Sequence, residues 1–154
     1  MSLPFANSPA DVVHYLLIAL GLGMLPVPGF AYTATSWPVN AGQEPDSPDN
    51  TITLYNTTGN KHARIMIDGE TVEDPGIQIR IRGTDDPTAS IQAELIKVAI
   101  DEKAIGYNVQ IGGHNFTVYA INRVGNPIQL GNESPTSRRR IYTINATVTL
   151  RQTT

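Results

Sequence analysis

The feature that most constrains this chain is a stretch of strict alternation, residues 77–82, in which every second residue is isoleucine. Side chains on a β-strand point alternately to opposite faces, so the three isoleucines share one face. Gln78, Arg80 and Arg82 share the other face. The stretch therefore predicts a strand that packs its isoleucines against a core and points its arginines away from that core.

A first helix is predicted from about Pro9 to Gly21. Ser8 suits the cap, Pro9 suits the first turn because its missing N–H is not needed there, and Asp11 favours the positive end of the helix dipole. The run from Val12 to Leu20 is almost wholly apolar. We expect this helix to lie between the sheet and a second surface, for example a neighbouring subunit.

A second helix is predicted from Asp86 and Pro87, as cap and first turn, to Gly106. Ile91, Leu95 and Val98, with Ala99, recur at helical spacing. We expect these residues to form the face that packs on the core.

Five further strands are predicted, at residues 32–39, 51–55, 108–111, 115–123 and 142–151. We expect a turn at residues 56–60, a flexible arm at about 60–76 and a polar loop at about 125–137. Strand runs interrupted by two helices predict an α+β fold. In it, a mainly antiparallel mixed β-sheet carries both helices on one face, and residues 1–154 form a single domain.

The composition excludes several classes of protein. The chain has no cysteine, which rules out disulfides, thiolate metal sites and a cysteine nucleophile. Its net charge of −3 gives no field that gathers nucleic acid, so no sequence-specific nucleic-acid partner is expected. The apolar run near the N-terminus is shorter than the roughly 20 residues that span a bilayer, and no Lys or Arg precedes it, so we expect neither a membrane segment nor a signal peptide.

Charge is unevenly distributed along the chain. Residues 44–86 hold nine acidic and four basic residues, whereas the part beyond Ala120 holds five arginines and one acid. This asymmetry suits a subunit that packs head to tail with its own copies. Ordinary solvated surface charge is the alternative.

No pattern of residues predicts an enzyme. The histidines, His14, His62 and His114, have no second ligand at a suitable spacing, so no metal site is expected. Asp85 and Asp86 are placed to cap the second helix, which explains the pair better than acid–base chemistry does. Gly112-Gly113 is a hairpin turn without the features of a phosphate loop. We therefore predict no catalytic site, no cofactor and no metal.

The one unusual feature left among the residue types is the excess of arginine over lysine, with eight Arg to three Lys. Its planar guanidinium suits repeated pairing with carboxylates across protein interfaces. The predicted subunit or partner interface consists of Arg80, Arg82, Arg138, Arg139 and Arg140. A solvated strand face and a charged edge that resists aggregation are the alternative explanation.

Several motifs together resemble one family. Asp68-Gly69-Glu70, the stretch from Asp74 to Gly83, and a capped helix with Ala89 and Ala93 are similar to the tail terminators of long-tailed bacteriophages, also described as minor capsid or head-tail joining proteins. The tract 126–140 matches no part of the family that we can assign.

The resemblance implies a structural virion protein, assembled in the host cytoplasm and located at the head-tail interface of the tail. It implies a homo-hexameric ring that caps the tail tube, ends its polymerisation and meets the head connector. The implied partners are other copies of the chain, the tail tube protein and a head-connector or stopper protein, with no membrane. The first helix and the arm at 64–76 would be candidates for ring contacts or docking. The alternatives are a head-completion or connector adaptor protein, a tail tube subunit, and a small ligand-binding or hydrolytic α+β domain.

Overall fold

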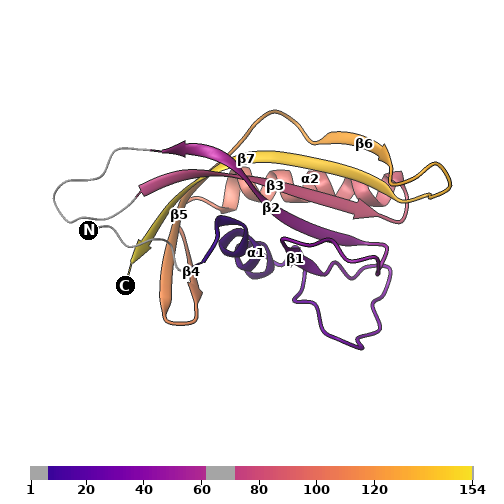
Figure 1. Ribbon diagram of the computed structural model, residues 1–154, viewed down its shortest axis with the longest axis horizontal. Helices are drawn as coiled ribbons and strands as arrows, with labels where there is room; N and C mark the ends of the chain where they lie inside the picture. Colours follow the sequence, from indigo (N-terminus) through magenta and orange to yellow (C-terminus); the bar gives the residue numbers. More distant parts are fainter. Residues whose placement is uncertain (1–6, 62–71, 154) are drawn as a thin grey trace.

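The structure is a computed structural model that describes residues 7–61 and 72–153 (Figure 1). The elements in chain order are α1 (Pro9–Ala19), β1 (Val39–Ala41), β2 (Thr51–Lys61), β3 (Val72–Gly83), α2 (Asp86–Lys103), β4 (Tyr107–Ile111), β5 (His114–Arg123), β6 (Ile128–Asn132) and β7 (Arg140–Thr153). The predicted fold class is confirmed, because two helices accompany one mixed, mostly antiparallel sheet of seven strands.

The sheet has the order β1-β2-β3-β7-β5-β4, with β6 paired to the beginning of β7. The pair β1 and β2 is parallel, and the other pairs are antiparallel. Helix α1 contacts β1 and β4, which stand at opposite ends of this order. The sheet therefore curls around α1, as Figure 1 shows.

The core lies on the face of the sheet that carries both helices. Ile77, Ile79 and Ile81 of β3 are fully buried there, as their alternation predicted. They belong to one cluster with residues of both helices, including Leu16 of α1 and Ile96 of α2. Helix α1 thus buries its apolar side chains inside its own subunit.

Helix α1 has the predicted cap, and the cap of α2 is Asp85, one residue before the predicted Asp86. In α1 the Ser8 hydroxyl accepts from Asp11 N–H, and the Asp11 carboxylate accepts from Ser8 N–H, which makes a capping box. In α2 the cap is Asp85, whose carboxylate accepts from Thr88 N–H at 3.0 Å. Hydrogen bonding with Thr88 lowers the pKa of the Asp85 carboxyl.

The neighbouring carboxylate, Asp86, does not cap the helix as Asp85 does but accepts hydrogen bonds from other elements. Its Oδ1 accepts from Tyr142 O–H at 2.9 Å and from Gln129 Nε2 at 2.7 Å. These bonds tie the first turn of α2 to β7 and β6. The sequence had predicted a cap for this pair, and the structure divides the pair into one cap and one tertiary contact.

Three sequence predictions for the strands need correction. The strand predicted at 32–39 forms only at its end: residues 32–37 are not in a strand, Pro38 makes an isolated bridge with Met24, and Val39 begins the short β1. Residues 56–60 are not a turn, because β2 continues through them opposite β3, with an irregularity between Thr57 and Asn60. The polar loop predicted at 125–137 contains β6, since β7 offers it a free edge.

The predicted arm lies largely within the sheet or outside the described residues. Asn60–Lys61 belongs to β2, and Val72–Gly76 belongs to β3. Residues 62–71, which include His62 and Arg64, lie outside the described part of the chain.

Candidate subunit interface

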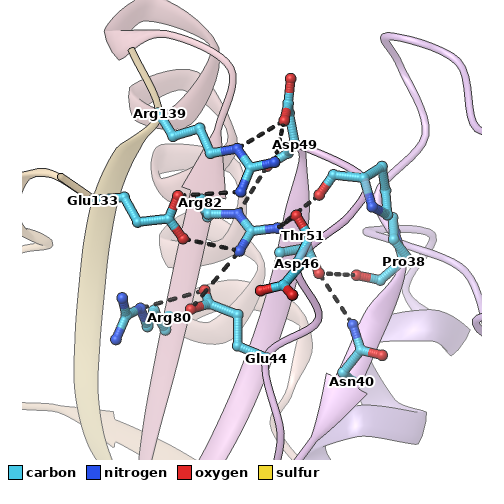
Figure 2. Close-up of polar contacts among 11 residues, drawn as sticks. Pro38, Asn40, Glu44, Asp46, Asp49, Thr51, Arg80, Arg82, Glu133 and Arg139 are labelled. Carbon is cyan, nitrogen blue, oxygen red and sulfur yellow. Dashed lines mark hydrogen bonds and ion pairs between the residues drawn. The ribbon is translucent and has the colours of Figure 1, made fainter. Parts of the chain in front are cut away.

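Arg82, one of the five predicted interface residues, is buried, with a side chain that is 1% exposed. It lies on the face of β3 opposite the core, where residues 42–50 and the segment before β7 cover it (Figure 2). Its Nη2 donates to the carbonyls of Pro48 at 2.7 Å and Asp46 at 3.3 Å. Its Nε donates to the Asp49 carbonyl at 3.2 Å, and its Nη1 to Glu133 Oε1 at 3.2 Å. Arg82 therefore holds two segments of its own subunit together.

Arg139 extends the same network. Its Nε donates to Asp49 Oδ1 at 2.7 Å, and its Nη1 donates to Glu133 Oε2 at 3.1 Å. Burial disfavours the charged guanidinium, but the hydrogen bonds with Asp49 and Glu133 outweigh it and raise the pKa of Arg139. Glu133 thus bridges two arginines, and Figure 2 shows its carboxylate between them.

Arg80 lies two residues before Arg82 on the same face of β3 and contacts Glu44. Its Nε lies 3.3 Å from Glu44 Oε1, an ion pair whose geometry is too bent to count as a hydrogen bond. Glu44 Oε2 also lies 3.9 Å from Arg82 Nη1. Burial first, and then the charge of Glu44, raise the pKa of the neighbouring Tyr55.

Arg138 and Arg140 differ from the other three. Arg138 is exposed and Arg140 is partly buried. In the described part of the chain neither has a carboxylate within ion-pair distance. The five predicted residues therefore divide into Arg80, Arg82 and Arg139, which contact segments of their own subunit, and Arg138 and Arg140, which have charge available for a partner.

Helix α2 carries an exposed apolar stripe that the sequence analysis placed in the core. Ile91 is 62% exposed, Leu95 52% and Val98 44%. The buried face consists instead of alanines and isoleucines with one amide side chain, namely Ala89, Gln92, Ala93, Ile96, Ala99 and Ile100. The prediction that Ile91, Leu95 and Val98 pack on the core was wrong, because β3 approaches too closely: a Cβ on Gly83 would lie 2.7 Å from Ala89 N.

The exposed stripe forms one wall of a groove. Residues 21–24 and 34–37 form the opposite wall, and the space between them is about 570 Å³. Gln92 fixes the two walls together, since its Nε2 donates to the Leu22 carbonyl at 2.9 Å. We call this surface, with Ile91 and Leu95 on its helical side, the α2 groove; Val98 lies beyond its lining. None of the residues that line it is charged.

A second exposed apolar surface follows β6. Val124 is 66% exposed, Ile128 48% and Leu130 56%. Residues 124–132 contain no charged residue, although charge is one of the ways in which edge strands are kept from pairing with other chains. We call this surface the β6 edge. No role for the tract 126–140 was predicted from the sequence, although Ile128 and Leu130 stand two residues apart, as apolar residues on one side of a strand do.

Other kinds of site find little support in the described residues. No group of three or more His, Asp or Glu in residues 7–61 and 72–153 is placed to hold a metal ion. No helix of these residues is long and apolar enough to cross a membrane. His14 lies near the core, with its Nε2 2.7 Å from the Val39 carbonyl.

Comparison with known proteins decides the family. A family model described as bacteriophage tail terminator protein matches residues 16–152. The chain belongs to this family. No curated protein sequence matches the chain. The matched span includes β3, α2 and the whole of the tract 126–140, so the resemblance inferred from residues 68–93 is confirmed. The tail terminator family is a structural one, which makes this chain a structural component of a phage tail.

Proposed function

We propose that this tail terminator caps the end of the phage tail tube as a homo-hexameric ring. The ring would stop the addition of tube subunits and present its other face to the head connector or stopper protein. Its site of action would be the head-tail interface of the virion. The observation that carries this proposal is the match to the tail terminator family over residues 16–152.

The surface of the subunit supports association with other copies. The α2 groove and the β6 edge are two separate uncharged surfaces on one chain, and both expose large apolar side chains. Exposed apolar surface of this kind marks sites of interaction with other proteins. A ring requires two different surfaces on each subunit, because each subunit meets one neighbour on either side.

The sheet gives the subunit a rigid frame for such contacts. Arg82, Arg139 and their carboxylates fix the loops on one face of β3, and the core fixes both helices on the other. Capping requires binding surfaces and no chemical step. We therefore assign the protein no enzymatic activity and no cofactor.

The experiment that tests the ring is native mass spectrometry with negative-stain images, on the protein alone and with isolated tail tubes. We expect six-membered rings, either free or at tube ends. Binding to heads without any binding to tubes would favour the head-completion or connector adaptor instead. A protein that stays monomeric under both conditions would refute the capping ring.

A further inference from the structure

The α2 groove and the β6 edge lie on opposite flanks of helix α2. On one flank, next to Ile91, Gln92 binds the Leu22 carbonyl of the opposite groove wall. On the other flank, Asp101 binds Arg123 with two hydrogen bonds of 2.8 Å, and Val124 follows directly. Successive residues of an α-helix are rotated by about 100° around its axis. Gln92 and Asp101 therefore project from different sides of α2, and the two flanks point in different directions. One subunit can therefore use both surfaces at the same time.

The two surfaces match in polarity. The lining of the α2 groove contains no charged residue, and neither does the segment 124–132 that forms the β6 edge. Two apolar surfaces that exclude charge can be buried against each other without leaving an unpaired charge.

The rims of the two surfaces are opposite in charge. Asp85, which binds Thr88 in the groove wall, has no ion-pair partner in the described part of the chain. Arg138 and Arg140 stand beside the β6 edge, with Arg140 opposite Asn132 in the ladder, and they also lack such a partner there. A carboxylate at one end of the groove thus complements the two guanidinium groups beside the strand.

We propose that the β6 edge of one copy seats in the α2 groove of the next copy. The contact is heterologous, because two different surfaces meet, and a chain of such contacts closes when the rotation between subunits allows it. The proposal rests on the proposed ring and names the surfaces that build it. Arg138 and Arg140 then act across the interface, towards Asp85 of the neighbour.

The test uses two single variants, Leu95→Glu in the groove and Leu130→Glu on the strand. Each puts a carboxylate into an apolar contact without adding a compensating charge to the other surface. We expect each variant alone to lose the ring and remain monomeric in native mass spectra. Tyr15→Glu, at an exposed position of α1, is the matched control and should keep the ring. Circular dichroism should show that all three variants are folded.

A mixture of the two variants gives the sharper result. Leu95→Glu keeps an intact β6 edge and Leu130→Glu keeps an intact α2 groove, so an equimolar mixture should form dimers with one chain of each. A groove-to-groove contact would behave differently, because Leu130→Glu alone would still dimerise. That result would overturn the proposal, and so would rings in both variants.

A covalent test follows from the absence of cysteine in the chain. A variant with both Leu95→Cys and Leu130→Cys should give a ladder of oligomers up to the closed ring with a short bismaleimide cross-linker. The pair Tyr15→Cys and Leu130→Cys should give none. Rings of the wild type that yield no ladder from the first pair would overturn the interface and leave the proposed function standing. If the wild type forms no ring alone or on tubes, the proposed function fails and the interface fails with it.

Discussion

Replacing Arg82 by methionine should destabilise the subunit by about 3–5 kcal/mol, the usual cost of breaking a buried charge network by removing one partner. The side chain is 1% exposed and makes four hydrogen bonds, three to backbone carbonyls and one to Glu133. Hydrogen bonds to charged groups contribute roughly 1.5–3 kcal/mol each, so the simple sum is larger than our estimate. We reduce it because Asp46 and Asp49 are at the surface, where water can replace the lost donor.

Two carboxylates near Arg82 would still be paired with another arginine after the substitution, which also limits the loss of stability. Glu133 remains paired with Arg139, and Glu44 remains paired with Arg80. The main effect should be that residues 42–50 lose their attachment to β3. Urea unfolding followed by tryptophan fluorescence measures the free energy, and limited proteolysis measures the release of this segment.

Arg80→Met is the matched control for this experiment. Arg80 lies on the same face of β3, but its side chain is 30% exposed and has one ion pair. Partly exposed pairs contribute about 0–1 kcal/mol, so this variant should unfold close to the wild type. If Arg82→Met lost less than about 1 kcal/mol, its effect would be no larger than that of a partly exposed ion pair. That result would refute the assignment of Arg82 as the residue that holds the two segments together. Equal losses for the two variants would refute it as well.

The other predictions concern packing, pH and salt. Gly83→Ala should cost about 1–3 kcal/mol in thermal unfolding because the added methyl group meets the backbone of α2, whereas an unchanged midpoint would mean that the helix moves away freely. Arg123 hydrogen bonds lower the pKa of the Asp101 carboxyl from 3.8, so its contribution to stability is complete above that pH and is lost as the pH falls below it. Urea unfolding from pH 7 to pH 2 should therefore show a larger loss in the wild type than in Asp101→Asn, and identical losses would contradict the pairing. Replacing Arg138 and Arg140 by serine should leave the unfolding free energy within about 0.5 kcal/mol but weaken the ring, most visibly at low salt. Unchanged assembly would assign both arginines to solvent.

The alternation of residues 77–82 was sufficient to predict a strand and its buried face, because a period of two allows few other structures. It was not sufficient to predict the fate of Arg82. The alternation places that side chain away from the core, but residues 42–50, more than 30 positions earlier, cover it. Coverage by a distant loop leaves no periodic signal in the strand itself.

Helix α2 illustrates a second limit of sequence reasoning. Its bounds were predicted to within three residues, from a cap at Asp86 and an end at Gly106 against the observed Asp86–Lys103 with its cap at Asp85, since caps and ends depend on local chemistry. Its orientation did not, because the helix has two apolar faces that overlap in sequence. The larger residues of one face, Ile91, Leu95 and Val98, were assigned to the core, whereas close packing against Gly83 selects the face with Ala89 and Ala93.

The interface predicted from the five arginines stays a prediction. In the described structure Arg138 and Arg140 have no ion-pair partner, whereas the other three arginines contact their own subunit. The two apolar surfaces were missed, since an exposed isoleucine and a buried one look the same in a sequence. Their recognition requires the fractional exposures.

The most direct test of the account is tube growth. Tail tube subunits are allowed to polymerise without heads, the protein is added, and tube lengths and ends are measured in electron micrographs over time. We predict that elongation stops and that each arrested tube carries one six-membered ring of this protein at its end. Tubes that continue to lengthen at saturating protein, with no ring at their ends, would contradict the proposal that this tail terminator caps the tube.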